Sequence, residues 1–101
     1  MGTVLLRREK YIDAGGDLVE LVLWQVPRSR AYPDGLRYRL AFLLAGTRQP
    51  AVLYDNHHPK GHHRHRGTVQ LGYAFSTVDQ LLKDFLAEVQ RVKMGRREGR
   101  Q

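Results

Sequence analysis

The sequence predicts an α+β domain: an antiparallel sheet of four or five strands in a meander, with one C-terminal helix packed on one face. Up to residue 54, β-branched and aromatic runs alternate with turns rich in Gly, Pro and Asp. From residue 78 the apolar period changes from two to 3.6, which indicates a helix. A chain of 101 residues can form one modest core.

Each expected strand is bounded by residues typical of turns. The turn at residues 13–17 contains two adjacent glycines, which supply the positive φ angles of a tight reversal. Pro27 ends the second strand because proline cannot donate to a ladder. On the third strand apolar residues alternate with Arg37 and Arg39, which predicts one core face and one basic face. The expected strands are residues 3–12, 18–26, 36–45 and 51–54, with a weaker fifth at 68–75.

The helix is expected to follow Ser76 or Thr77, either of which can act as N-cap. Asp79 or Gln80 would complete a capping box, and Phe75 is placed for a hydrophobic staple. Apolar residues recur at three- and four-residue steps and predict one buried stripe. These residues are Val78, Leu81, Leu82, Phe85, Leu86, Val89 and Val92.

The chain is expected to be a single domain over residues 1–94. Residues 95–101 contain Gly and Arg and nothing to bury, which predicts a flexible basic tail. The second strand is apolar on both faces, whereas one helix covers only one face of a sheet. A homodimer or a protein partner is therefore expected to cover the remaining apolar surface.

The composition of the chain limits the classes of partner that are expected. A formal net charge of +7 favours anionic partners, of which nucleic acid and acidic proteins are the abundant ones. The absence of cysteine removes disulfides, thiolate nucleophiles and sulfur-ligated zinc, and fits a cytoplasmic protein. The apolar run near the N-terminus is too short for a signal peptide or a membrane span, so no membrane partner is expected.

The segment of residues 54–66 is the main candidate for function. All five histidines of the protein lie between residues 57 and 65, together with Lys60 and Arg64. Pro59 and Gly61 indicate a shaped loop rather than a helix. Tyr38, Tyr54, Tyr73 and Trp24 could stack on bases near this loop, but aromatic residues at alternate strand positions are more often core residues.

Imidazole can both give and take a proton near neutral pH, and cleavage of RNA through its 2′-hydroxyl needs a base, an acid and a cation for the phosphate. The segment therefore predicts a metal-independent endoribonuclease that requires no cofactor. The candidate acid and base are His57, His62, His63 and His65, and Asp55 would orient an imidazole. The candidate phosphate-binding residues are Lys60, Arg64, Arg66, Arg37 and Arg39.

Three alternatives remain open for this segment. It could bind nucleic acid or a protein without chemistry, or its imidazoles and Asp55 could bind a transition metal in a metal-dependent enzyme. The spacing matches none of the strong metal motifs, and interleaved cations would oppose a dication. The third alternative is a solvated turn in which Asp55 and Asn56 form local side-chain hydrogen bonds.

The run of Tyr54, Asp55, Asn56 and His57, continued by the Lys-Gly-His-His-Arg-His run of residues 60–65, resembles the TumE family of toxins from prokaryotic toxin–antitoxin pairs. Residues 19–27 and 38–42 and the entry to the helix agree. The resemblance implies a growth-inhibiting protein encoded beside a helix-turn-helix antitoxin that neutralises it and represses the operon. It supplies no chemistry for RNA cleavage. Pro59 stands where the family run has glycine, which would stiffen the loop.

Overall fold

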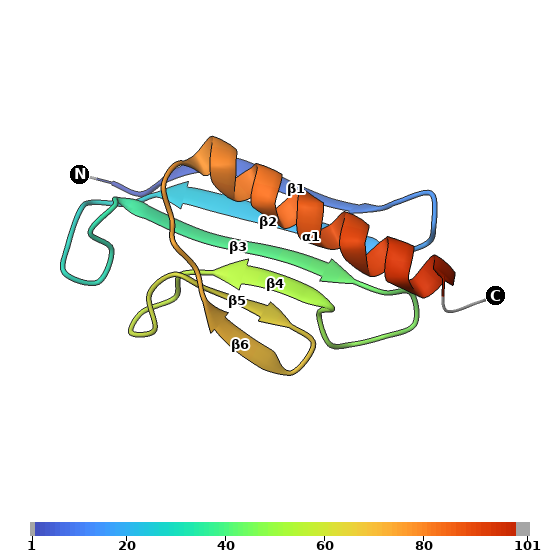
Figure 1. Ribbon diagram of the computed structural model, residues 1–101. Helices are drawn as coiled ribbons and strands as arrows, with labels where there is room; N and C mark the ends of the chain where they lie inside the picture. Colours follow the sequence, from blue (N-terminus) through green and yellow to red (C-terminus); the bar gives the residue numbers. More distant parts are fainter. Residues whose placement is uncertain (1, 99–101) are drawn as a thin grey trace.

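The protein is an antiparallel sheet crossed on one face by a single helix (Figure 1). A computed structural model describes residues 2–98. The strands lie in chain order across the sheet, so the α+β meander is confirmed, but the sheet has six strands rather than four or five. The elements are β1 (Val4–Ile12), β2 (Leu18–Gln25), β3 (Leu36–Leu43), β4 (Val52–Asp55), β5 (His63–Arg66), β6 (Val69–Gly72) and α1 (Val78–Glu98).

The strand missing from the prediction is β5, whose sequence His-Arg-His-Arg contains no aliphatic residue. It pairs with β4, and a hairpin turn at Gly67 leads into β6. Gly67 has φ of +60°, a conformation that glycine adopts without steric cost. Strand prediction from sequence relies on apolar alternation, and a strand of imidazoles and guanidiniums has none.

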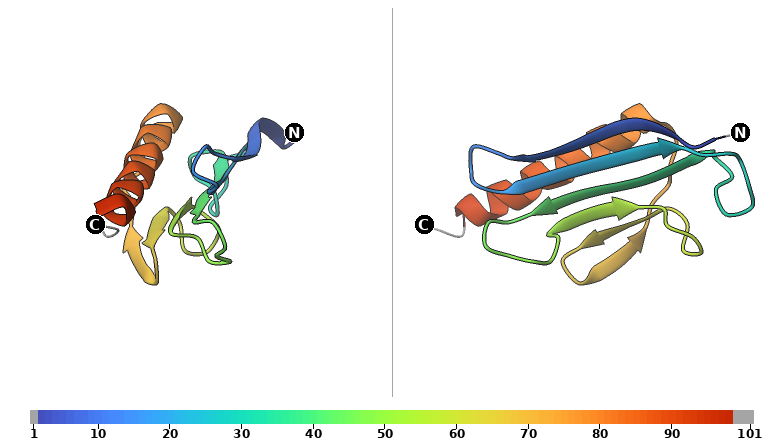
Figure 2. Two further views of the ribbon diagram at one scale, coloured as in Figure 1. Left: turned by 90° about the vertical axis from the view of Figure 1, so that its right-hand side faces the viewer. Right: turned by 180° about the vertical axis from the view of Figure 1, so that it is seen from behind.

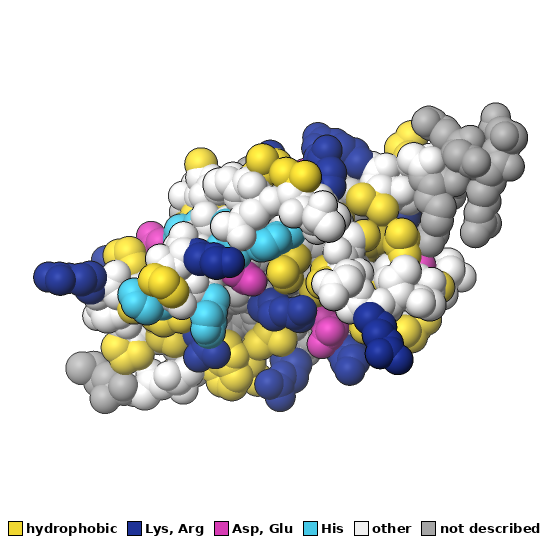
Figure 3. All heavy atoms as spheres, turned by 90° about the horizontal axis from the view of Figure 1, so that it is seen from below, with side chains coloured by type: hydrophobic (Ala, Val, Ile, Leu, Met, Phe, Trp, Pro, Cys, Tyr) yellow, Lys and Arg dark blue, Asp and Glu magenta, His cyan; other side chains and the backbone are white. Residues whose placement is uncertain are grey.

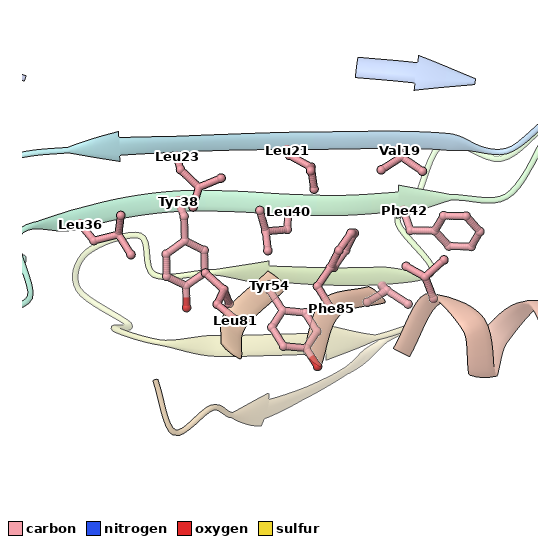
Figure 4. Close-up of a cluster of buried hydrophobic side chains, with 12 residues drawn as sticks. Val19, Leu21, Leu23, Leu36, Tyr38, Leu40, Phe42, Tyr54, Leu81 and Phe85 are labelled. Atoms are coloured by element: carbon pink, nitrogen blue, oxygen red, sulfur yellow. The ribbon is translucent and has the colours of Figure 1, made fainter. Parts of the chain in front are cut away.

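The core lies between α1 and the facing side chains of β2, β3 and β4 (Figure 4). Leu40, Phe42, Leu81 and Phe85 are fully buried there, which confirms the predicted apolar face of the third strand and the predicted helical stripe. Burial of such side chains stabilises the domain by about 1.5 to 3 kcal/mol each. Leu86, which the stripe was expected to include, is exposed.

Thr77 is the N-cap of α1, since its hydroxyl accepts a hydrogen bond from the Gln80 amide at 3.1 Å. The Gln80 side chain does not close a capping box; it donates to Asp84 at 2.8 Å. The helix continues to Glu98, within the segment that was expected to be a flexible tail. Residues 99–101 of that segment lie outside the described residues.

The sheet curves so that β5 and β6 turn toward the helix, and its opposite side forms an outer face (Figure 2). The β2–β3 register places Trp24 opposite Arg37 and Val22 opposite Arg39 on this outer face. Tyr38 and Tyr54 are buried as expected, but Trp24 is only half-buried and does not belong to the helix-side core. The core assignment of Trp24 was therefore wrong. Its neighbour Leu23 faces the helix instead, because successive strand residues point to opposite faces.

Candidate functional site

The outer face of the sheet carries a cavity of about 670 Å³, which we call the outer-face pocket. It is bounded by β2 to β5 and by the loop of residues 56–62 that joins β4 to β5. Its lining combines apolar, cationic and imidazole side chains. The lining residues include Val22, Trp24, Arg37, Arg39, Asp55, His57, His58, Lys60, His63 and His65. Seen from below, histidines gather with Lys and Arg at the end of the molecule beside this loop (Figure 3).

The Tyr54, Asp55 and Asn56 run at the end of β4 gives each side chain a different role. Tyr54 points into the core, and Asp55 points into the outer-face pocket. Asn56 is buried: its amide donates to the Leu36 carbonyl at 2.7 Å, and its oxygen accepts from the Tyr38 amide at 2.9 Å. The Asn56 side chain thus extends the ladder to β3 and fixes where the loop leaves the sheet.

His63 is held rigidly at the start of β5, where it lies opposite Asp55 in the β4–β5 register. Its Nε2 lies 2.8 Å from the Asp55 carboxylate, and its Nδ1 lies 2.8 Å from the Gly61 carbonyl oxygen. Only 6% of the side chain is exposed. Both ring nitrogens are therefore engaged, and His63 has no free nitrogen with which to take a proton from a substrate.

His65 lies two residues further along β5 on the same face, as the alternation of strand side chains predicts. The His63 and His65 ring centroids are 5.0 Å apart in an edge-on arrangement. Burial lowers the pKa of His65 below its usual value of 6.5, and the neighbouring His63 lowers that pKa further. Asp55 opposes this effect, and the Lys60 charge makes the smallest contribution to the lowering of the pKa. The His65 nitrogens make no hydrogen bond within the described residues. His65 is therefore available as a neutral proton acceptor.

The structure does not bring His62 together with the other candidate histidines. Its ring stacks on Phe75 at 4.7 Å, its Nδ1 lies 3.0 Å from the Tyr38 hydroxyl, and its Nε2 lies 2.6 Å from the Asp34 carboxylate. Burial raises the pKa of Tyr38, so this hydroxyl stays protonated and can donate to Nδ1. His62 thus links the loop before β3, the core and the segment that leads into α1.

Arg64 and Arg66 also lie away from the outer-face pocket. They occupy the opposite face of β5 and contact Glu88 of α1 at 3.0 and 2.7 Å. The Glu88 carboxylate is only 4% exposed and pairs with both guanidiniums, whose side chains are themselves partly exposed. Of the predicted phosphate-binding residues, the structure places Arg37, Arg39 and Lys60 in the pocket and Arg64 and Arg66 on the helix side.

The three pocket cations are available to an anion. Among the side chains that the structure describes, those of residues 2–95, Arg37 has no partner in an ion pair or hydrogen bond. Arg39 lies 3.9 Å from Glu20, and Lys60 donates only to the neutral Gln70 side chain. Among the same residues, no group of three or more His, Asp or Glu side chains is arranged to hold a metal ion.

Asn56, which supports the loop beside the pocket, and Val22 and Trp24, which line the pocket, are not among the site residues predicted from the sequence. Asn56 acts through its buried hydrogen bonds, and only its place in the Tyr-Asp-Asn run could have singled it out. Trp24 and Val22 reach the pocket because they face away from the helix. Nothing in an apolar strand such as β2 tells which of its two faces meets the helix.

The fold and pocket define a class of protein: a small basic α+β domain with an imidazole and guanidinium pocket on the open face of its sheet. A family model described as "Toxin TumE" matches residues 4–93, and the chain belongs to the TumE toxin family. Membership implies an antitoxin partner. No curated protein and no solved structure matches the chain. No helix within residues 2–98 is long and apolar enough to cross a membrane.

Proposed function

We propose that the protein is the toxin of a toxin–antitoxin pair and that it acts on RNA as a metal-independent endoribonuclease. One observation carries the proposal: His65, with its lowered pKa, lies beside the Asp55–His63 pair in a pocket lined by Arg37, Arg39 and Lys60. Family membership supports the toxin role, and the pocket chemistry supports the reaction.

In the proposed reaction, neutral His65 takes the proton of a 2′-hydroxyl. The 2′-oxygen then attacks the adjacent phosphorus, the bond from phosphorus to the 5′-oxygen breaks, and that oxygen leaves with a proton from an acid. The products are a 2′,3′-cyclic phosphate and a 5′-hydroxyl. We assign the acid to His57, which lies on the loop side of the pocket with an exposed ring.

The other groups position and stabilise. Asp55 and the Gly61 carbonyl hold both nitrogens of His63, so that its ring is fixed beside His65 in the pocket without shuttling protons. Arg37, Arg39 and Lys60 would stabilise the charge that develops on the phosphate oxygens. We further propose that the antitoxin is a helix-turn-helix protein encoded in the same operon, as the resemblance implies. A small helix-turn-helix reading frame beside the gene would support this.

The test uses purified full-length protein and RNA in excess chelator. Cleavage to 2′,3′-cyclic phosphate ends is expected, and a 2′-O-methyl RNA should stay intact because it lacks the attacking hydroxyl. His65→Gln should lower the rate about 10²- to 10⁴-fold, the usual contribution of a general base. Lys83→Gln on the exposed side of α1 should keep the wild-type rate.

The outcomes separate the alternatives. Cleavage that chelator abolishes would favour the metal-dependent enzyme. RNA that binds but stays intact across the pH range would leave the non-catalytic binding module. Equal thermal unfolding midpoints for His65→Gln and the wild type ensure that a lost rate reports on chemistry.

A further inference from the structure

Trp24 is the single tryptophan of the protein, and it lies on the outer face of β2 in the wall of the outer-face pocket. It contributes nothing to the helix-side core, which is built from its neighbours on the opposite face of β2. An aromatic ring that is half-buried and open to a cation-lined pocket is arranged like the stacking platforms of proteins that bind single-stranded nucleic acid.

Cations surround the indole. Arg37 lies directly opposite Trp24 in the β2–β3 register, and it has no ion-pair partner among the side chains of residues 2–95. The Arg8 guanidinium of β1 lies over the indole ring, 5.9 Å from its centroid, so a base would stack on the part of the ring that lines the pocket. A base stacked on Trp24 would thus have guanidiniums on both sides for its flanking phosphates.

Arg37 and Arg39 lie between Trp24 and the proposed catalytic groups on the outer face of the sheet. Arg37 and Arg39 are alternate residues of β3 on the outer face, and Arg39 lies opposite Asp55, which in turn lies opposite His63. Three strand spacings across and two residues along the sheet separate Trp24 from His63, roughly 16 Å at ordinary sheet dimensions. Trp24 is therefore too far away to hold the base at the scissile phosphate. It could hold a base further along the same strand.

We propose that Trp24 is a base-stacking subsite and that the substrate of the pocket is single-stranded RNA, whose backbone runs from His65 past Arg39 and Arg37 to a base on Trp24. This rests on the proposed function and deepens it. A base inside a duplex is stacked on its neighbours and cannot present its face to an indole, so the geometry selects unpaired RNA.

Since Trp24 is the only tryptophan, its fluorescence reports on this subsite alone. The probe is a single-stranded 2′-O-methyl oligonucleotide, which can bind but cannot be cleaved through its 2′-oxygen. It should quench the indole fluorescence in a saturable way. Inorganic polyphosphate, which has the charge but no bases, should quench little at equal occupancy, and a duplex of the same sequence should bind more weakly and quench less.

Substitutions test the contribution to affinity, measured by the anisotropy of a labelled oligonucleotide. Trp24→Leu should weaken binding fivefold or more, as expected for the loss of one base–aromatic stack. Trp24→Phe, which keeps an aromatic face, should restore most of the affinity. Tyr11→Leu is the matched control, because Tyr11 is an exposed aromatic residue outside the pocket and should bind as the wild type does.

Unchanged fluorescence at saturating oligonucleotide, or Trp24→Leu and Trp24→Phe both binding as the wild type does, would overturn the subsite. Quenching by polyphosphate as strong as by the oligonucleotide would overturn it too. Because the probe cannot be cleaved, these results are independent of the chemistry. Normal quenching with intact cleavable RNA would refute the ribonuclease reaction while supporting the subsite, and cleavage with an unchanged KM in Trp24→Leu would do the reverse.

Discussion

Two histidines on one face of β5 have different environments and therefore different chemistry. His63 has both nitrogens engaged, one by the Asp55 carboxylate and one by the Gly61 carbonyl. His65 has neither nitrogen engaged within the described residues, and its burial and the charge of His63 lower its pKa. His63, the buried histidine, thus lowers the pKa of His65, and His65 is free to accept a proton.

The lowered pKa of His65 sets the pH dependence of the proposed cleavage. A base works in its neutral form, so the rate should fall as pH falls through the pKa of His65, which lies below 6.5. The Lys60 charge contributes to the lowering, so Lys60→Gln should move this acid limb to higher pH. The measurement is kcat/KM against pH, read as the position of the limb rather than its height. An acid limb that stays in place or moves to lower pH in Lys60→Gln would contradict the assignment of His65 as base; Lys83→Gln is the control.

Asn56 offers a second test at the residue scale. Its side chain makes two buried hydrogen bonds to the backbone of β3. Asn56→Ala therefore leaves the Tyr38 amide and the Leu36 carbonyl without their partners. We expect a loss of about 2 kcal/mol in the free energy of unfolding, from the usual cost of unsatisfied buried polar groups. Denaturant unfolding measures it, with the exposed Gln90→Ala as a control that should change by less than about 0.5 kcal/mol. An equal effect of both substitutions would contradict the role of Asn56.

At the scale of elements, β5 is held between two acidic residues on opposite faces. Asp55 of β4 binds His63 on the outer face, and Glu88 of α1 binds Arg64 and Arg66 on the helix face. A strand without aliphatic side chains is thus fixed by charge-assisted hydrogen bonds on both sides. The presentation of His65 to the pocket depends on this arrangement.

Glu88→Gln tests the link between α1 and β5. The two arginines are 34% and 55% exposed, so solvent screens part of the interaction, and we expect a loss of about 1 to 2 kcal/mol in the free energy of unfolding. Arg91→Gln removes a contact of 3.7 Å to the same carboxylate from a largely exposed side chain, and should cost less than about 0.5 kcal/mol. Denaturant unfolding of both variants decides, and equal effects would show that β5 does not depend on Glu88.

The elements also show where sequence reasoning succeeds. Strands β2 to β4 and the helix were predicted because their apolar residues are buried against one another, as Leu40, Phe42, Leu81 and Phe85 show. Strand β1 is exposed along almost all of its length and was predicted from its β-branched and aromatic residues and the turn that follows it. The strand β5 was missed because the carboxylates of Asp55 and Glu88 hold it in place of an apolar face, and such pairing leaves no apolar period in the sequence. The segment of residues 54–66 was identified from its histidines and cations. The separation of His62 and Arg64 from His63 and His65 was not predicted, because it depends on contacts with residues elsewhere in the chain.

At the scale of the whole molecule, the chain carries a net charge of +7. The basic side chains on the helix side and on the outer face of the sheet differ in whether an acidic side chain neutralises them. On the helix side, Arg64 and Arg66 are neutralised by Glu88. On the outer face, Arg37 and Lys60 have no acidic partner among the described side chains of residues 2–95, and Arg39 has only the distant Glu20 there. Residues 37–39 and residues 64–66 are both basic in the sequence, but only Arg37 and Arg39 are available to bind a polyanion.

This division predicts how RNA binding depends on salt. Each phosphate contact to a single strand contributes about −0.7 to the slope of log affinity against log salt concentration, because a bound cation releases counterions. The double variant Arg37→Gln with Arg39→Gln should therefore make the slope shallower by about 1.4. Arg48→Gln with Arg91→Gln removes the same charge from exposed positions outside the pocket. The measurement is the anisotropy of a labelled 2′-O-methyl oligonucleotide, titrated over a range of salt concentrations. If affinity followed net charge alone, both double variants would change the slope equally, which would contradict the prediction. A larger change for the Arg37 and Arg39 pair locates the phosphate track on the outer face, beside the proposed catalytic histidines.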